Sequence, residues 1–569
     1  MTDQRNLLLA IVLSIAILLG FQFLYEVPRM EQRQAEVAQQ QATEQAEVPQ
    51  PQAGVQAPGV PMTREELIAA TAERRVRIDT PRLHGSISSV GGRIDDLTLA
   101  DYEVTVDPGS PEIVLLSPPG TSNPYYAEFG WVTEPGSDMP VPGPDTNWEI
   151  RGGPLTPDNP IAMTWDNGRG LVFEKTVSID RNYMFTVNQQ VRNTGGEPVT
   201  LFPYELVSRH GMPETEGFFI LHEGPLGVLD GQLREYDYED LSDEGRIEST
   251  TTGGWLGITD KYWLVSLVPP QDEPVAARFL YNAREGQDRY QVDTLGEAVR
   301  IAPGEAAEHT SRLFAGAKEV RLLDAYAEEL GIEKFDLAVD FGWFYFLTKP
   351  FFYALDYLAR LIGNFGVAIL VLTVFVKLVF FPLANKSYKA MSKMKALQPE
   401  MTKIRERYGE DRERMSQEIM ALYKREKANP VSGCLPIVIQ IPVFFALYKV
   451  LFVTIEMRHA PFFGWIQDLS APDPTSIFNL FGLIPWDPPT LLMIGVWPII
   501  MGVTMFLQQK LNPAPPDPVQ AKVFMALPFV FTFMLASFPA GLVIYWAWNN
   551  ALSILQQWVI MRRMGVKVT

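Results

Sequence analysis

The sequence predicts a membrane protein in which a large all-β domain precedes an α-helical core of five spans, with one further anchor helix at the N-terminus. Residues 1–340 contain one long apolar run, at the N-terminus, whereas residues 341–569 contain several. Runs of 17 or more apolar residues are long enough to cross a bilayer as helices. Between these regions, short apolar–polar alternations separated by Gly-rich turns indicate β-strands.

The charge and cysteine content exclude two classes of protein. The net charge is −19, so the chain as a whole has no electrostatic case for binding DNA. Cys434 is the single cysteine, which rules out an internal disulfide and a disulfide scaffold. A large exported domain without disulfides suits the bacterial envelope.

The N-terminal apolar run, Asn6 to Tyr25, reads "NLLLAIVLSIAILLGFQFLY". It is either an uncleaved anchor or a cleaved signal peptide. Its length and the absence of a small-x-small cleavage site before "EVPRMEQRQ" favour an anchor over residues 1–28. Residues 29–65 are rich in Gln, Ala, Glu and Pro and lack aromatics, which predicts a disordered tether.

Alternating segments such as "GLVFEKTVSIDRNYMFTVNQQVRN" predict a β-sandwich over residues 66–316. Its histidines, His84, His210, His222 and His309, are scattered and lack metal-ligand spacing such as HExxH. No paired catalytic residues stand out either. We therefore expect no catalytic residues, no metal and no cofactor.

Residues 317–363 are predicted to form linking and interfacial helices. "AKEVRLLDAYAEEL" (Ala317–Leu330) has helical periodicity. The aromatic, amphipathic segment Phe341–Gly363 is interrupted by Pro350 and carries Lys349, Asp356 and Arg360. Those charges disfavour a span, so we expect a helix lying in the membrane interface.

Five apolar segments then predict the core spans, at residues 364–383, 431–452, 491–508, 523–538 and 541–560. Their connections are a cytoplasmic hairpin, a periplasmic loop, a cytoplasmic loop and a cytoplasmic tail, at residues 384–430, 453–490, 509–522 and 561–569. The hairpin holds 12 Lys and Arg against 7 Asp and Glu, and positive loops stay in the cytoplasm. This predicts a multi-pass inner-membrane protein with both termini cytoplasmic and the β-domain periplasmic.

The cytoplasmic segment has helical spacing, is basic on one face and is Met-rich on the other. Two interpretations are open: a solvated hairpin that packs only on itself, or a docking surface for anionic lipid or ribosomal RNA. The candidate docking residues are Met391, Met394, Lys395, Met401, Arg405, Arg407 and Met415.

Lys377 places a positive charge inside the apolar run "LTVFVKLVFFPL". A charge at the centre of a span costs about 2.5–3.5 kcal/mol on insertion scales. It could snorkel to the headgroups, or it could line a shared hydrophilic groove, because other spans also carry polar groups at middle depth. The candidate groove residues are Thr373, Lys377, Gln440, Tyr545, Trp546, Asn549 and Asn550. The side-chain amides of these residues could instead form hydrogen bonds that hold neighbouring helices together.

Two other functional classes are compatible with parts of the sequence. A transporter could use Lys377 as a substrate-anion or proton site, but five core spans show no evident inverted repeat. A carbohydrate enzyme or binder would use the β-domain. No GxxxxGK[ST] motif is present, so ATP bound to this chain does not drive any work.

Several strings resemble the YidC family of membrane protein insertases, among them "DFGWFYFLTKPFF", "ILVLTVFVKLVFFPL", "KMKALQPEM", "DLSAPDP" and "FPAGLVIYW". The resemblance runs the whole length. It implies a β-domain similar to a galactose-mutarotase-like supersandwich. The family usually has Arg where this chain has Lys377, and often a second Tyr where it has Trp546. Because the C-terminal tail is short, ribosome contact through a long basic tail is not expected.

The resemblance further implies an insertase and folding chaperone rather than an enzyme. It would insert nascent membrane proteins into the bacterial inner membrane, alone or beside the Sec translocon. The groove would open to the cytoplasm and to lipid and contain the positive charge of Lys377. The expected partners are nascent chains, the Sec translocon, the lipid bilayer and, through the cytoplasmic hairpin, the ribosome.

Overall fold

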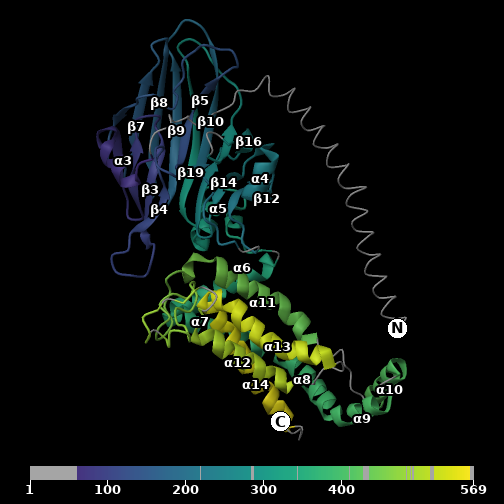
Figure 1. Cartoon of the computed structure of the whole chain (residues 1–569). Coiled ribbons are helices and arrows are strands. Elements are labelled where there is room, and N and C mark those ends of the chain that lie inside the picture. The colour runs from purple at the N-terminus through teal and green to yellow at the C-terminus, as the bar shows by residue number, and fades with distance from the viewer. Residues whose placement is uncertain are drawn as a thin grey trace.

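The computed structural model describes residues 61–217, 220–283, 287–342, 344–408, 411–426, 435–481, 483–486, 488–489, 493–512 and 518–563. The anchor expected at 1–28 and nearly all of the expected tether lie outside the described residues. The described chain forms a β-domain stacked on a bundle of helices, with helix α6 lying across the junction (Figure 1).

Two antiparallel sheets pack face to face in the β-domain. One sheet comprises β1 (Arg75–Asp79), β2 (Leu83–Ser88), β3 (Ile94–Glu103), β4 (Glu112–Leu116), β5 (Tyr125–Thr133), β10 (Val199–His210), β13 (Arg246–Thr252), β16 (Pro274–Tyr281), β17 (Arg289–Leu295) and β18 (Val299–Ile301). The other comprises β6 (Glu149–Arg151), β7 (Ile161–Asp166), β8 (Leu171–Ile179), β9 (Met184–Asn193), β11 (Gly224–Leu229), β12 (Gln232–Glu235), β14 (Trp255–Thr259), β15 (Trp263–Val268) and β19 (Ala306–Ala317).

The strands follow the period-two pattern of the sequence. In β8, the alternate residues Leu171, Phe173, Lys175, Val177 and Ile179 are buried, and the residues between them are partly exposed. Such alternation places one face of a strand in the core between the sheets. The large antiparallel all-β domain predicted from the sequence is therefore confirmed.

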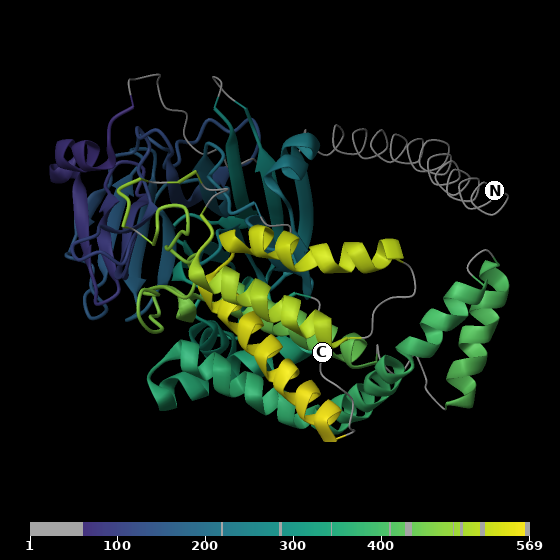
Figure 2. The ribbon, with the colours of Figure 1, turned by 60° about the horizontal axis from the view of Figure 1, so that its bottom comes forward.

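The helices that follow the sandwich are α5 (Val320–Glu329), α6 (Tyr345–Ile362), α7 (Phe365–Val379), α8 (Phe381–Ala396), α9 (Gln398–Tyr408), α10 (Arg412–Arg425), α11 (Leu435–Val453), α12 (Val496–Leu511), α13 (Pro518–Met534) and α14 (Ala540–Arg563). Short helices elsewhere are α3 (Arg64–Ala70), α4 (Tyr238–Glu244), η2 (Ala72–Arg74), η3 (Phe335–Ala338), η5 (Ile455–Met457) and η7 (Leu535–Ser537). Seen from below, α7 and α11–α14 lie in front of the β-domain, and α9 and α10 project to one side (Figure 2).

Helix α6 corrects one expectation, because Pro350 lies inside a continuous helix and does not interrupt it. Its charged residues have partners within the protein. Lys349 lies 2.8 Å from Asp324 and 2.6 Å from Asp336, and buried Asp356 pairs with Arg321 and Arg360. These ion pairs fix one face of α6 beneath the β-domain.

Polar contacts also join the β-domain to the helices. The Lys449 ammonium on α11 lies 2.6 Å from the Asp340 carboxylate. The backbone N–H of Val320, at the start of α5, donates to the buried Glu456 carboxylate at 3.2 Å. Arg458 donates to the Glu103 carbonyl in the β3–β4 hairpin at 2.5 Å. The β-domain is thus held to the helical core by directional bonds as well as by apolar packing.

A 70° bend divides the first core segment into α7 and α8, with Phe380 between them. Pro382 explains the bend, since it has no N–H to bond the carbonyl four residues earlier and its ring clashes there. Among the described residues, the α7–α8 pair is long and apolar enough to cross a bilayer when its two parts are taken together, and no single helix meets that test alone.

Candidate functional site

Helix α7 carries the cationic candidate, Lys377, on the face that also holds Thr373. Residues four apart share one side of a helix. Thr373 is buried, and its hydroxyl donates to the Ile369 carbonyl at 2.6 Å. Asn364 caps the start of the helix, and its side chain accepts a hydrogen bond from the backbone N–H of Val367. Capping fixes the start of α7, and the bend at Phe380 fixes its end close to Lys377.

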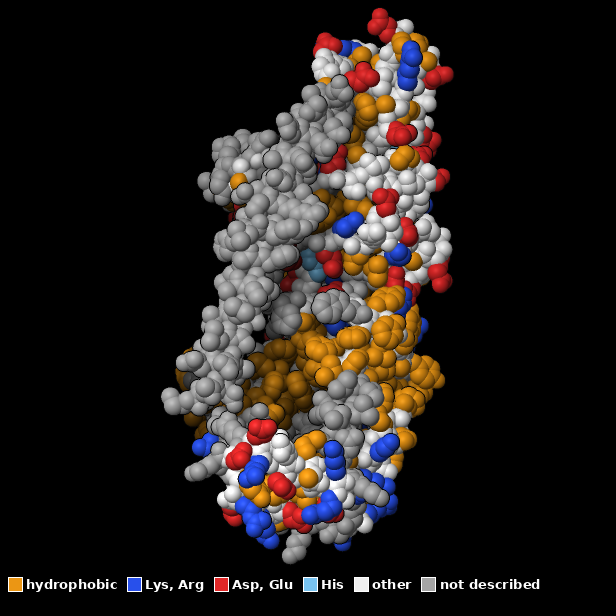
Figure 3. Space-filling model, turned by 90° about the vertical axis from the view of Figure 1, so that its right-hand side faces the viewer, with side chains coloured by type: hydrophobic (Ala, Val, Ile, Leu, Met, Phe, Trp, Pro, Cys, Tyr) orange, Lys and Arg blue, Asp and Glu red, His pale blue; other side chains and the backbone are white. Residues whose placement is uncertain are grey.

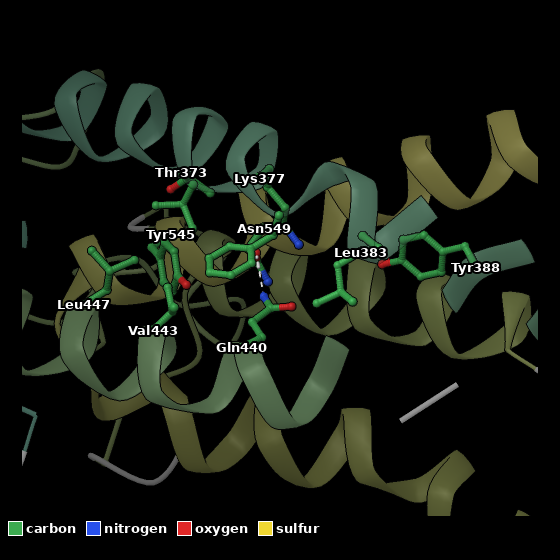
Figure 4. Close-up of a pocket in the computed structure, with 12 residues that line it drawn as sticks. Thr373, Lys377, Leu383, Tyr388, Gln440, Val443, Leu447, Tyr545 and Asn549 are labelled. Carbon is green, nitrogen blue, oxygen red and sulfur yellow. Dashed lines mark hydrogen bonds between the residues drawn. The ribbon is translucent and has the colours of Figure 1, made fainter. Parts of the chain in front are cut away.

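Lys377 faces a cleft between α7, α8, α11 and α14 (Figure 4). The residues that line it are Thr373, Val376, Lys377, Phe380, Leu383, Ala384, Tyr388, Gln440, Val443, Leu447, Tyr545 and Asn549. Polar groups from all four helices meet in an otherwise apolar lining. Of the candidate residues, Thr373, Lys377, Gln440, Tyr545 and Asn549 are brought together here.

The Lys377 ammonium donates a hydrogen bond of 2.8 Å to the Ser553 hydroxyl on α14. Ser553 is itself buried and donates to the Asn549 carbonyl at 2.8 Å. The Tyr388 hydroxyl on α8 also interacts with Ser553. Within the described part of the chain, no carboxylate forms an ion pair with Lys377. Within the described residues, the Lys377 ammonium is therefore held by a neutral hydroxyl group.

Two amides cross the cleft, since Gln440 on α11 donates to the Asn549 side chain on α14 at 3.1 Å (Figure 4). Tyr545, one turn before Asn549, is buried and stacks on Phe444 with 6.4 Å between ring centroids. The Gln440–Asn549 bond joins two helices, as expected for interhelical glue, and it also lines the cleft.

Trp546 and Asn550 lie outside the cleft lining. The Trp546 ring packs against Phe444 at 4.9 Å and against Phe531 of α13 at 6.1 Å. Asn550 is buried, and its amide nitrogen has no hydrogen-bond partner among the residues that the structure describes. Each is one residue beyond a cleft residue, and one residue turns a helix by about 100°.

The face of α7 turned away from the cleft is apolar and exposed, with Val371, Val374, Phe375, Leu378 and Val379 on the surface. Hydrophobic side chains gather over the helical region in Figure 3. They lie between a β-domain of mixed charge and a lower end rich in Lys and Arg. A surface of this kind fits the hydrocarbon layer of a bilayer.

The segment predicted to be a cytoplasmic hairpin contains α8, α9 and α10. Met401, Ile419 and Leu422 are buried in a small core of its own, packed against Met415 and Ile404. Met394 is also buried, and Met391 is half-buried. Much of the apolar face expected to dock partners is therefore covered by the hairpin itself.

The charged face of the hairpin remains outside. Arg407 is exposed and Arg405 is half-buried. Lys395 instead donates from its ammonium to the Lys510 carbonyl at 3.1 Å, near the C-terminal end of α12. A cation is favourable at a helix C-terminus, so this bond links the hairpin to the bundle.

The β-domain histidines do not form a metal site. His309 lies 3.4 Å from Glu205, His84 lies 2.9 Å from Glu112, and His210 packs on the Tyr126 ring. Among the described residues, no group of three or more metal-ligating side chains is positioned to hold an ion.

Comparison with known proteins matches both halves of the chain. Residues 75–354 fit the model of the YidC periplasmic domain, and residues 357–567 fit that of the 60Kd inner membrane protein family. The membrane protein insertase YidC of Methylorubrum extorquens is 55% identical over the whole chain and 96% of the relative's own length. The chain belongs to the YidC family of membrane protein insertases.

Other YidC relatives are similarly close. The insertase of Bradyrhizobium diazoefficiens is 52% identical over the whole chain and 97% of its own length. A crystal structure of an active YidC insertase shares 17% identity and a TM-score of 0.36, covering 85% of this chain and 92% of that one. A galactose mutarotase related enzyme from Lactobacillus acidophilus covers 42% of this chain, with 11% identity and a TM-score of 0.31.

Membership of the YidC family establishes the broad function. The chain is a bacterial inner-membrane insertase with a periplasmic β-domain, and it acts on nascent membrane proteins in the lipid bilayer. YidC proteins are insertases rather than enzymes. The sequence-based expectation of this function is confirmed.

Two polar residues of the site, Ser553 beside Lys377 and Tyr388 in the cleft lining, were missed from the sequence. Ser553 lies four residues after Asn549, so the i, i+4 rule that paired Tyr545 with Asn549 extends to it. Tyr388 follows the bend at Phe380 and joins the cleft lining from α8. No periodicity carries across such a bend, so the sequence offers no comparable signal for Tyr388.

Proposed function

We propose that the cleft around Lys377 is the hydrophilic groove through which this insertase passes the polar, exported segments of its clients. One observation carries the proposal: an ammonium on an apolar helix is held by a neutral hydroxyl, with no carboxylate of the described chain beside it. Such a group attracts an acidic or polar segment. Lys377 lowers the barrier to crossing and does not need to bind tightly.

The position of the cleft along the helices supports an opening toward the cytoplasm. Leu383, Ala384 and Tyr388 belong to α8, which leads into the basic hairpin, and they line the cleft together with Lys377. At the other end of the bundle, the β-domain and α6 cover the helices (Figure 1). A client tail would enter from the hairpin side and cross a shortened apolar barrier.

The topology is part of the proposal. The basic hairpin and the C-terminal end of α14, with Arg562 and Arg563, lie at the end of the bundle opposite the β-domain. Basic segments remain in the cytoplasm. We assign five core spans to α7, α11, α12, α13 and α14, and place both termini in the cytoplasm. Burial of the client helix in lipid drives insertion, aided by the membrane potential on acidic residues.

The hairpin and the β-domain are candidates for contact with larger partners. The exposed basic face of α9 carries Lys403 and Arg407 and would meet ribosomal RNA or anionic lipid. Insertion would proceed alone or beside the Sec translocon. Binding of purified ribosomes to Lys403→Glu/Arg407→Glu protein, compared with the unaltered protein at several salt concentrations, tests the first contact.

The groove is tested by insertion into liposomes containing only the purified protein. A single-span client with an acidic exported tail is added, and protease protection of the tail is measured. Lys377→Arg should support insertion, whereas Lys377→Ala and Lys377→Glu should impair it. Lys510→Ala, at the end of α12 and outside the cleft lining, is the matched control. Full activity of Lys377→Glu with several such clients would refute the role of the charge.

A further inference from the structure

The loop between α11 and α12 contains an apolar tip, which we define as residues 476–481 and 483–486. Its large side chains are exposed rather than buried. Leu483 is 83% exposed, and the exposed fractions of Leu480 and Phe481 are 51% and 53%. The other exposed apolar members are Ile477, Phe478, Ile484 and Trp486. A cluster of this size on a surface loop marks a contact with another apolar phase.

The tip lacks the features of a loop in water. No Asp, Glu, Lys, Arg or His occurs between Asp473 and Asp487. Its backbone is hydrogen-bonded within the loop. The N–H of Phe481 donates to the Ser476 carbonyl at 2.8 Å, and that of Ile484 to the Asn479 carbonyl at 3.0 Å. Internal satisfaction of backbone groups is what an apolar environment demands.

Two exposed residues of the tip have a left-handed backbone conformation. Leu480 and Phe481 both have positive φ angles, 48° and 58°, which non-glycine residues adopt at a cost. Strained backbone of this kind persists where surrounding structure enforces it and is concentrated at functional positions. Here it turns the chain sharply between two exposed apolar residues.

The base of the loop is fixed to the start of α12. One Asp473 oxygen accepts from the Trp497 N–H at 2.9 Å, and the other from the Trp465 indole at 3.1 Å. The Thr475 hydroxyl accepts from the Val496 N–H at 3.0 Å. In the same loop, the Phe462 carbonyl accepts from Asn364 at the start of α7. The apolar tip is therefore held at the end of the helices nearest the β-domain (Figure 1).

We propose that the apolar tip, residues 476–481 and 483–486, inserts into the periplasmic leaflet of the bilayer as an apolar wedge beside α12. The proposal rests on the orientation given under Proposed function, in which α12 begins at the periplasmic face. The lipid surface is the occupant because the tip continues the apolar surface of membrane helices and carries no charge to pair with a protein partner. Aromatic residues such as Trp465 and Trp486 are favoured at this depth.

The wedge would set the depth of the core and link it to the β-domain. Arg458, in the same loop, donates to the carbonyls of Glu103 and Val104 in the β3–β4 hairpin. A displacement of the loop in the leaflet would therefore shift the β3–β4 hairpin of the β-domain. It would also disturb lipid packing next to the helices along which a client leaves.

A fluorescent label at Leu483 tests the wedge in the full chain. In a Cys434→Ser background, Leu483→Cys is coupled to the polarity-sensitive fluorophore NBD and reconstituted into phosphatidylcholine–phosphatidylglycerol vesicles. Because Leu483 is so exposed, the label should not disturb folding. We expect blue-shifted emission, quenching by brominated phospholipids and protection from iodide. Thr194→Cys is the matched control, because Thr194 is exposed on the turn between β9 and β10. The other end of β9, at the β8–β9 turn, is the end near the helices, since the Tyr326 hydroxyl of α5 donates to Asp180 there.

Two results would overturn the wedge. In the first, the label at position 483 emits like the label at position 194, is quenched by iodide and is not quenched by brominated lipid. In the second, the label at position 483 is protected from iodide only after a client or translocon is added. The second result would assign the tip to a protein partner. Client insertion is measured in the same vesicles. If the client is inserted while the label at position 483 is in water, the wedge is rejected and the groove is not. If that label is in lipid while the client is not inserted, the groove is rejected and the wedge is not.

Discussion

The Lys377 ammonium and the Ser553 hydroxyl, 176 residues apart in sequence, form a 2.8 Å hydrogen bond that ties α7 to the last helix. A lysine in a span can otherwise extend its stem toward the headgroups. Ser553 holds the charge inside the cleft instead. Because a hydroxyl is neutral, it positions the charge without cancelling it.

Replacing Ser553 by Ala should weaken insertion without abolishing it. The loss of a hydrogen bond to a charged group corresponds to about 1.5–3 kcal/mol, so we expect a decrease in initial insertion rate of roughly 10-fold or more. Ser553→Thr should restore the rate, because it keeps the hydroxyl. The rate of reaction of Lys377 with an amine reagent, followed by peptide mass spectrometry, should rise in Ser553→Ala only. An unchanged reaction rate would show that Ser553 does not hold the ammonium.

Glu456 should make the junction between the β-domain and the helices sensitive to pH. Burial raises the pKa of Glu456 from 4.5 to about 7, and the negative charges of Glu319 and Asp356 add to the rise. The folded state therefore binds this proton more tightly than the unfolded state. Stability should be highest below about pH 4.5 and should fall by about 3 kcal/mol as the pH rises to about 7.

Glu456→Gln removes the titrating proton and keeps an acceptor for the Val320 N–H. Thermal unfolding measured between pH 5 and pH 8 should show a higher melting temperature for the variant than for the unaltered protein at pH 8. The two should converge toward pH 5. Equal pH dependence in both proteins would mean that Glu456 does not titrate in this range.

The hairpin should unfold as a separate small unit. Leu422 and Ile419 are buried in its own core, so Leu422→Ala should cost about 2–5 kcal/mol locally. Hydrogen exchange should then accelerate throughout α9 and α10 and stay unchanged in β8 and β9. Met420→Ala, on the same helix but 48% exposed, is the control and should leave exchange as it is. Faster exchange in the β-domain would contradict this independence.

How far the sequence predicts the structure depends on the range of each signal. Period-two alternation located strands such as β8, and i, i+4 spacing put Thr373 and Lys377 on one face, because both are local properties of one element. Trp546 was expected in the groove but packs against α13. Which neighbouring helix a face meets is a tertiary property, and one residue of rotation changes it.

The hairpin core and the ion pairs of α6 also show that sequence patterns do not identify tertiary partners. The apolar face of the hairpin is equally consistent with a docking surface and with a self-packed core, because amphipathicity does not identify the surface against which a helix packs. Exposed Leu483 and buried Leu422 have the same hydropathy, and only the fold separates them. Lys349, Asp356 and Arg360 argued against a span in the sequence, and in the structure two of their ion-pair partners come from α5.

The buried ion pair between Arg278 and Asp293 should be costly to break and much cheaper to replace. The two residues face each other on β16 and β17, are at most 1% exposed, and form a 2.6 Å bond. Asp293→Leu leaves the Arg278 guanidinium buried without its carboxylate, which should destabilise the β-domain by about 3–5 kcal/mol. Adding Arg278→Met removes the unpaired charge and should recover most of that loss, because two apolar side chains need no partner.

Denaturant unfolding followed by tryptophan fluorescence measures the stability of both variants. Arg77→Met, in a pair whose side chains are 71% and 44% exposed, should change stability by less than about 0.5 kcal/mol. If the double variant is as unstable as Asp293→Leu alone, shape rather than charge dominates at this site.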